Sequence, residues 1–271
     1  MREGEAGRAE SGLLAPEDPA PFIVVDPDGR PDLLLVCDHA GAAVPAALDR
    51  LGLDDSALAR HIGWDIGAAA VTHLLARRLG APAVLSGYSR LVIDCNRTLD
   101  DPTSIPMISD GQVVPGNQEL SATEKQARAE ACFWPYHRAI EAQLERATAL
   151  GAAPAMISMH SFTPWMNGFA RPWHIGILWE RDPRIPVPLL AGLAARPGLV
   201  VGDNQPYSGH DPEGYTLRQH AIPRGLPHVL IELRQDEIGT VAGVERFAEH
   251  LAAALQPILA DPELFRAAVY L

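Results

Sequence analysis

Two histidines of the sequence each follow a run of apolar residues. His39 comes after Leu33–Cys37 (LLLVC) and Asp38, and His160 comes directly after Ala155–Met159 (AMISM). Imidazole is a preferred ligand of Zn²⁺, and a catalytic zinc takes three protein ligands from His and Asp or Glu while keeping one position open. A lone histidine in such a place is more often a structural hydrogen-bond partner, but two of them together favour a metal site.

Three residues are candidates for the third ligand of this site. Asp65, in the segment HIGWD that begins at His61, is the first candidate, and Asp38 and His61 are its substitutes. Asp65 lies at the start of a predicted helix over Ile66–Leu79, where a carboxylate is equally suited to cap the helix N-terminus. The sequence has no HExxH motif and no closely spaced histidine and cysteine cluster, so the site would be assembled from distant segments.

An acidic residue ends another apolar run. Glu232 is the last residue of His228–Glu232 (HVLIE), where a carboxylate without a function is costly to bury. As a general base, it would take a proton from the attacking water and deliver it to the departing amine. The alternative is a structural salt bridge with Arg234 or another arginine.

Two arginines flank the apolar run Leu91–Asp94 (LVID), namely Arg90 before it and Arg97 after it. Guanidinium groups match carboxylates through two parallel hydrogen bonds, so these side chains are suited to hold an acidic substrate or to stabilise a developing oxyanion. The alternative for both is solvated surface charge.

Apolar runs alternate with helical patterns along the chain, which indicates an α/β sheet with helices on both faces. Strands are predicted over Leu33–Cys37, Leu91–Asp94, Ala155–Met159, His174–Trp179 and His228–Glu232, and helices over Ile66–Leu79, about 123–150, Pro188–Ala195 and Val244–Leu259. Ser121 and Glu124 form a capping-box pattern at the start of the long helix, and Pro135 should kink or divide it. In open α/β sheets ligands bind outside the carboxyl ends of the strands, so the polar strand endings are expected to converge on one cleft.

Composition narrows the class of protein. A chain of 271 residues with 47% hydrophobic residues fits one α/β domain, predicted over residues 21–271 after a flexible tail over residues 1–20. The formal charge of -12 argues against nucleic acid as a partner, and no run of about 18 apolar residues is present to cross a membrane. Cys37, Cys95 and Cys132 form no CxxC pair and are interpreted as small core residues, which together with the lack of a secretory signal favours a cytoplasmic protein.

Six segments taken together resemble the N-formylglutamate amidohydrolase family. They are CDHAG (37–41), HIGWDIGA (61–68), YSRLVIDCNR (88–97), HSFTP (160–164), GDNQPY (202–207) and IELRQD (231–236). The resemblance covers residues 33 to 240 in the same order. It implies a three-layer α/β/α fold with a mixed, largely parallel central sheet, similar to zinc-dependent exopeptidases and aspartoacylase-like deacylases.

The same resemblance implies roles for single residues. His39, His160 and Asp65 would hold one Zn²⁺ per chain, Glu232 would be the general base, and Asn96 with Arg97 resembles the Asn-Arg pair with which carboxypeptidase-like enzymes grip a substrate carboxylate. The carboxypeptidase-like pattern has a glutamate three residues after its first histidine, but this sequence has Ala42 there, so the third ligand must come from elsewhere.

The activity implied is hydrolysis of N-formyl-L-glutamate to formate and glutamate, the last step of one histidine-degradation route. The partner would then be a small acidic N-acyl amino acid, with Arg90 assisting catalysis. Two alternatives remain open: a deacylase or carboxypeptidase-like hydrolase for another N-acyl amino acid, and a non-catalytic protein that binds a metal or a metabolite on the same scaffold.

Overall fold

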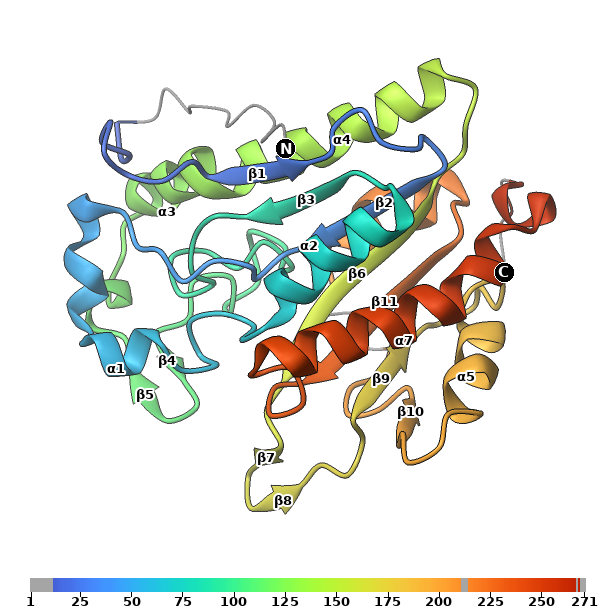
Figure 1. Ribbon diagram of the computed structural model, residues 1–271. Coiled ribbons are helices and arrows are strands. Elements are labelled where there is room, and N and C mark those ends of the chain that lie inside the picture. The colour runs from blue at the N-terminus through green and yellow to red at the C-terminus, as the bar shows by residue number, and fades with distance from the viewer. Residues whose placement is uncertain (1–11, 211–213, 267, 269–271) are drawn as a thin grey trace.

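A computed structural model of the chain describes residues 12–210, 214–266 and 268. Its central sheet is built from β1 (Phe22–Val25), β2 (Leu33–Cys37), β3 (Ala83–Ser86), β6 (Ala155–Phe162), β9 (Ile175–Leu178), β10 (Val201–Asp203) and β11 (His228–Arg234). The strand order is β1-β3-β2-β6-β11-β9-β10 (Figure 1). The four central strands β3, β2, β6 and β11 run parallel, β1 pairs antiparallel with β3, and the parallel pair β9–β10 runs opposite to β11. The sheet is therefore mixed and largely parallel, as predicted.

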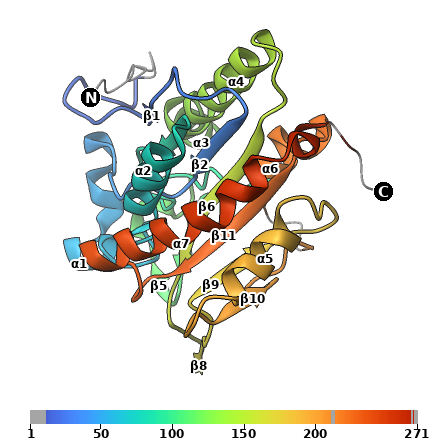
Figure 2. The ribbon, with the colours of Figure 1, turned by 45° about the vertical axis from the view of Figure 1, so that its right-hand side comes forward.

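Helices cover both faces of this sheet (Figure 2). One layer contains α2 (Ala68–Leu79), α5 (Pro186–Ala194) and α7 (Val241–Leu259), and the other contains α4 (Trp134–Ala149) and the short α6 (Thr216–His220). Successive side chains of a strand point to opposite faces. Leu33 and Leu35 of β2 accordingly pack in the core under α2 and α7, while Leu34 and Val36 pack against α4. The predicted three-layer α/β/α fold is confirmed.

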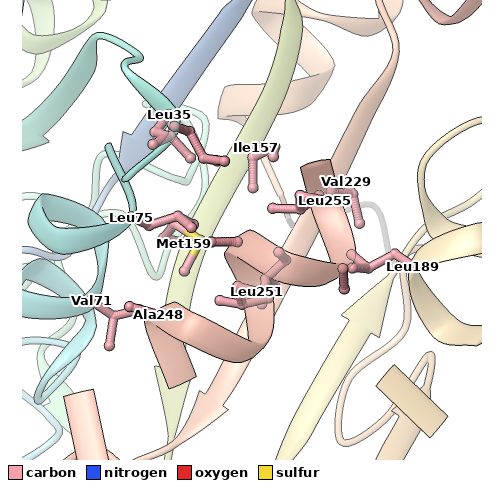
Figure 3. Close-up of a cluster of buried hydrophobic side chains, with 14 of the residues drawn as sticks. Leu35, Val71, Leu75, Ile157, Met159, Leu189, Val229, Ala248, Leu251 and Leu255 are labelled. Atoms are coloured by element: carbon pink, nitrogen blue, oxygen red, sulfur yellow. The ribbon is translucent and has the colours of Figure 1, made fainter. Parts of the chain in front are cut away.

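The larger core lies between the sheet and the pair α2–α7. Figure 3 shows Leu75 of α2 and Leu251 of α7 meeting over Ile157 and Met159 of β6, all of them fully buried. Burial of a leucine or isoleucine side chain stabilises a fold by about 1.5–3 kcal/mol, so this cluster fixes the strands whose ends carry the polar residues.

One predicted strand is wrong. Leu91 and Val92 lie in a turn, and Ile93 and Asp94 have irregular backbone. Val92 N donates to Ser89 O at 2.9 Å and closes this turn, while the Ser89 hydroxyl donates to Gly63 O of another loop at 2.7 Å. The apolar side chains of this segment are buried in a second core cluster outside the sheet. The strand beside β2 is β3 instead, which the sequence reading missed together with β1 and β10.

The other predicted elements are present with shifted ends. β6 extends three residues past Met159, so His160 lies inside the strand, and β11 extends past Glu232 to Arg234. The long helix is divided into α3 (Ala122–Arg128), a π-helical turn (Ala129–Phe133) and α4, and Pro135 directly follows this turn. Both hydrogen bonds of the predicted capping box are formed by Ser121 and Glu124.

Short elements complete the described chain. They are α1 (Asp55–Leu58), the hairpin β4 (Ile108–Ser109) and β5 (Gln112–Val113), the hairpin β7 (Trp165–Met166) and β8 (Phe169–Ala170), and 3-10 turns over Ala46–Gly52, Pro115–Asn117, Ile222–Arg224 and Pro262–Phe265. The three cysteines are free and buried, as expected for core residues. No described helix combines the length and apolar character that a bilayer crossing requires.

The segment predicted as a tail is described only in part. Residues 1–11 lie outside the described residues. From Leu13 onward the chain lies on the domain: Leu13 and Leu14 pack against the second core cluster, Pro19 O accepts a hydrogen bond from the Tyr88 hydroxyl, and Asp18 accepts one from Ala46 N at 3.0 Å.

Candidate active site

A pocket with about 240 Å³ of space lies on the α6 side of the sheet, beside the carboxyl ends of β2, β6 and β11. All seven site residues predicted from the sequence line it: His39, Asp65, Arg90, Asn96, Arg97, His160 and Glu232. The expected convergence of these distant segments on one cleft is therefore observed. His160 and Glu232 are direct neighbours in the register of β6 and β11, so their side chains leave the same face of the sheet.

The two histidines and Asp65 form a compact buried cluster. One ligand atom from each of the three lies within 4.8 Å of the others. Asp65 Oδ2 is 2.8 Å from His160 Nδ1 and 3.3 Å from His39 Nδ1, and the two imidazole rings are 5.0 Å apart between centroids. Two imidazole nitrogens and a carboxylate with one side toward a pocket are a donor set that suits a catalytic Zn²⁺.

The outer nitrogen of each imidazole faces a second carboxylate. His39 Nε2 lies 2.7 Å from Asp94 Oδ1, and His160 Nε2 lies 3.0 Å from Asp38 Oδ2. Since an ionised carboxylate can only accept, each Nε2 carries a hydrogen and donates it. A protonated imidazole also donates from Nδ1 to Asp65, whereas a neutral imidazole keeps its hydrogen on Nε2, and its Nδ1 lone pair can then bind a cation beside Asp65, which is how histidine ligands of metals are commonly oriented. The residues present therefore fit a metal ion.

Asp38 is itself held in place by hydroxyl groups. Tyr136 and Thr216 donate hydrogen bonds to its Oδ1 at 2.9 and 2.5 Å, and Ser158 donates to its Oδ2 at 3.2 Å. Burial by itself would raise the pKa of the Asp38 carboxyl, but the hydrogen bond from His160, the charges of His160 and His39, and the hydrogen bond from Thr216 lower it below the ordinary value. Asp38 thus stays ionised and orients His160.

The charges at the centre of the cluster stabilise one another. Burial would raise the pKa of the Asp65 carboxyl, but the two neighbouring histidines lower it below its ordinary value. Burial would likewise lower the pKa values of His39 and His160, yet the carboxylates around them raise both. The carboxylates outweigh burial, so the site favours positive charge at the point where the three ligand atoms meet.

The geometry separates the three candidates for the third ligand. Asp65 does not cap α2: the helix begins after Gly67 without a side-chain cap, and the carboxylate bonds the histidines and Ser161 N instead. The capping interpretation is wrong. Asp38 lies on the far side of the His160 ring, and His61 Nε2 lies 3.3 Å from Asp110 Oδ2, so neither joins the described cluster.

Glu232 is buried without an ion pair to Arg234. The Arg234 guanidinium binds Asp236 and Glu237 instead, so the salt-bridge alternative is wrong. Glu232 is only 7% exposed, and its Oε2 has no hydrogen-bond partner among the described residues. Burial raises the pKa of the Glu232 carboxyl to about 7. A carboxyl with this pKa can accept and release a proton near neutral pH.

Arg90 and Asn96 make structural contacts in addition to the catalytic and substrate-binding roles predicted for them from the sequence. Arg90 Nη2 donates to Asp94 Oδ2 at 2.8 Å, and Arg90 Nη1 lies 3.5 Å from Asp65 Oδ1, so this guanidinium also contacts the cluster of His39, Asp65 and His160. Asn96 Oδ1 accepts hydrogen bonds from Tyr215 N and Thr216 N at 2.8 and 2.9 Å and thereby anchors α6. The Arg97 side chain lines the pocket and is partly buried.

The sequence did not predict several residues in and around the pocket. Asp94 orients His39 although it was read only as the end of a strand, and Tyr207 lines the pocket from the loop after β10. Arg171 holds Tyr207, with its guanidinium 5.0 Å from the ring centroid and 3.1 Å from the hydroxyl oxygen. Tyr207 ends one of the segments that carried the family resemblance, which was its only signal.

Comparison with known proteins is consistent with this arrangement. The family model "N-formylglutamate amidohydrolase" matches residues 32–239, which contain every residue of the cluster. The chain belongs to this family. A curated relative from Pseudomonas aeruginosa, named N-formylglutamate deformylase, is 25% identical over 260 residues, covering 85% of this chain and 92% of the relative.

Solved structures support the same family fold. A gene product of Agrobacterium tumefaciens is 35% identical with a TM-score of 0.89, covering 93% of this chain and 99% of that chain. An N-formylglutamate amidohydrolase from Ralstonia eutropha has a TM-score of 0.67 at 21% identity, covering 89% of this chain and 97% of that chain, a likeness that concerns the fold alone. The chain is thus a member of a hydrolase family.

Proposed function

We propose that the chain is a metal-dependent deformylase that hydrolyses N-formyl-L-glutamate to formate and glutamate. Membership of the family and the similarity to a named N-formylglutamate deformylase support the substrate. The observation that carries the metal requirement is the cluster of His39, Asp65 and His160, in which both imidazoles are oriented by carboxylates and open toward the pocket.

His39 Nδ1, His160 Nδ1 and Asp65 would hold the ion, with zinc favoured by this donor set. When bound there, a zinc ion supplies Lewis-acid chemistry to the amide carbonyl. Asp38 and Asp94 keep the imidazoles in the tautomer that leaves Nδ1 free, and Arg90 sets the position of Asp65 by its contact at 3.5 Å.

Glu232 moves the proton in this proposal. Its carboxylate accepts a proton from the water that attacks the formyl carbon, and it then delivers that proton to the amide nitrogen as the carbon–nitrogen bond breaks. A pKa of about 7 suits both halves of the transfer, because neither the protonated nor the ionised form is strongly disfavoured near neutral pH. Arg97, supported by Asn96, would pair with a carboxylate of the substrate.

The decisive experiment measures metal content and formate release on the same purified protein. We expect about one zinc per chain, release of formate from N-formyl-L-glutamate, loss of that activity after dialysis against a chelator, and recovery on addition of zinc. Formate release that survives complete removal of metal would overturn the metal requirement. Zinc binding with no turnover of any N-acyl amino acid would favour the non-catalytic alternative.

A further inference from the structure

The loop after β10 is fixed to the end of β9 by hydrogen bonds. Asn204 N donates to Ile177 O at 2.9 Å, and the Asn204 side-chain oxygen accepts hydrogen bonds from Trp179 N and Gly209 N at 3.0 and 2.8 Å. These bonds hold both ends of the short segment from Asn204 to Gly209, which contains Tyr207. The backbone that carries Tyr207 therefore has a defined place on the sheet.

A glycine allows this segment to approach Glu232. Gly176 of β9 lies directly opposite Glu232 of β11 in the antiparallel register, so a side chain at position 176 would leave the same face of the sheet as Glu232. The loop fills that space, since a Cβ atom built on Gly176 would lie 1.9 Å from Gln205 O. Tyr207 follows two residues later and lines the same pocket as Glu232.

The Tyr207 side chain extends from this loop toward β6. Its hydroxyl accepts a hydrogen bond from Arg171 Nη1 at 3.1 Å, and the Arg171 guanidinium is also 5.7 Å from the ring centroid of Phe162 on β6. Phe162 lies two residues after His160 and leaves β6 on the same face. Because β11 lies between β6 and β9, the Tyr207 side chain passes over β11 close to Glu232.

Arg171 is a buried cation that forms no ion pair with a carboxylate of the described residues. It is 7% exposed, and its guanidinium contacts backbone oxygen, two aromatic rings and the Tyr207 hydroxyl. Arg90 differs, because its guanidinium is shared between Asp94 and Asp65. A buried guanidinium without a carboxylate favours any negative charge that forms close to it.

The Tyr207 hydroxyl presents a single hydrogen-bond donor to the pocket. Burial raises the pKa of this hydroxyl above its ordinary value, and the charge of Glu232 raises it further, so the hydroxyl is protonated at neutral pH. It accepts from Arg171 and donates to no group of the described residues. Arg171 is not among the residues that line the pocket, so it is not placed to hold a carboxylate by two hydrogen bonds, whereas one hydroxyl suits one oxygen atom.

We propose that Tyr207 is a further catalytic residue whose hydroxyl donates a hydrogen bond to the carbonyl oxygen of the scissile amide, and that Arg171 positions this hydroxyl. The inference rests on the proposed function, since it concerns the same amide hydrolysis. As the water oxygen bonds to the formyl carbon, the electron pair of the carbonyl double bond moves onto its oxygen, and the proton of the water passes to Glu232. The double bond forms again as the carbon–nitrogen bond breaks, and the nitrogen takes the proton from Glu232. Negative charge on the oxygen exists only between these steps, so the donor stabilises the transition state more than the substrate.

Tyr207→Phe removes the hydroxyl and keeps the ring. On zinc-loaded protein with N-formyl-L-glutamate, we expect kcat to fall about 100- to 1,000-fold, with KM within about threefold of wild type and unchanged zinc content. Tyr88→Phe is the matched control and should keep the wild-type kcat, because its hydroxyl bonds Pro19 O outside the pocket. A wild-type kcat in Tyr207→Phe overturns the inference and leaves the proposed function standing. Absence of turnover in the wild type overturns the proposed function and the inference with it.

Binding of the product separates this role from contact with a substrate carboxylate. L-glutamate has both carboxylates of the substrate but no formyl group, so Tyr207→Phe should leave its inhibition constant unchanged. If KM for N-formyl-L-glutamate and the inhibition constant of L-glutamate both rise about tenfold at unchanged kcat, Tyr207 holds a carboxylate and the assignment to the carbonyl oxygen is wrong. Loss of zinc from Tyr207→Phe also overturns the assignment, because the hydroxyl would then support the metal cluster.

A double-mutant cycle tests the role of Arg171. If Arg171 acts through the Tyr207 hydroxyl, Arg171→Met lowers kcat by itself, but Arg171→Met combined with Tyr207→Phe lowers it no further than Tyr207→Phe alone. Arg171→Lys keeps the positive charge and should retain more of the wild-type kcat than Arg171→Met, at unchanged KM. Additive losses in the double variant, or equal losses in Arg171→Lys and Arg171→Met, overturn the positioning role.

Discussion

In the two halves of the candidate site, the pKa values of the buried carboxylates are shifted in opposite directions. Beside β2 and β6, Asp38 and Asp94 each accept a hydrogen bond from an imidazole, and the pKa of each is lowered despite burial. Beside β11, Glu232 is just as buried, yet its Oε2 has no described partner and burial raises its pKa. The difference comes from the hydrogen bonds and positive charges around Asp38 and Asp94, and not from depth of burial.

This contrast separates fixed charge from movable charge. A carboxylate that accepts several hydrogen bonds keeps its negative charge and holds its neighbours in one orientation, as Asp38 does for His160. A carboxylate without such partners changes its protonation state at little cost near neutral pH, as Glu232 would. Two buried acids whose pKa values are pushed apart in this manner are typical of an active site.

The largest effect on metal binding and activity is expected in the half of the site with fixed charge, beside β2 and β6. His160→Ala removes one of the two imidazoles that meet Asp65, and we expect loss of bound zinc together with loss of detectable formate release. Metal analysis and a formate assay on the purified variant measure both. His250→Ala on α7, in the opposite helical layer, is the control and should keep metal and activity. Wild-type metal content in His160→Ala would contradict the proposed cluster.

Glu232→Gln changes only the half of the site in which the charge is movable. The amide keeps the shape of the side chain but cannot accept the proton of the attacking water, so we expect kcat to fall about 100- to 10,000-fold while zinc stays bound. Glu249→Gln, at an exposed position of α7, should leave kcat unchanged. If Glu232→Gln lost its metal as completely as His160→Ala, the two halves would not be functionally separate.

The residues that the sequence could reveal were those at the ends of buried strands. His39, His160 and Glu232 were predicted because each ends or follows an apolar run, and a polar residue is conspicuous there. The same reasoning failed for Leu91–Asp94, which is apolar because it is buried in a loop cluster and not because it lies in the sheet. An apolar run predicts burial, and it does not distinguish a strand from a buried loop.

The hydrogen-bond partners of the candidate ligands could not be predicted from the sequence. Asp38 precedes His39 in the chain, yet it bonds His160, which lies 122 positions away, and His39 bonds Asp94 instead. These pairings depend on which strands become neighbours and on the direction in which each side chain leaves its strand. The local sequence pattern does not show which strands are neighbours or where each side chain points, whereas the strand order and register of the fold determine both.

Thermal stability should show the raised pKa of Glu232 directly. Because its folded-state pKa of about 7 lies above the ordinary value of 4.5, the protonated form stabilises the fold at low pH, and this stabilisation is lost as the pH rises through 7. In metal-free protein the contribution should fall by roughly 2–3 kcal/mol between pH 5 and pH 8. Glu232→Gln cannot titrate, so its free energy of unfolding relative to wild type should rise by that amount over the same interval. A difference that is constant with pH would show that Glu232 is not perturbed.

The smallest effect is expected from the carboxylates behind the imidazoles. Asp38→Asn keeps the size of the side chain but weakens the acceptor that orients His160, and we expect zinc affinity to fall about 10- to 100-fold without complete loss of metal. Competition with a fluorescent zinc chelator measures the change. Asp94→Asn should have a comparable effect through His39, and Asp182→Asn, a buried aspartate paired with Arg184 away from the cluster, is the control that should retain wild-type affinity. Unchanged zinc affinity in both Asp38→Asn and Asp94→Asn would mean that packing alone orients the imidazoles. The ionised carboxylates behind them would then make no contribution to zinc binding.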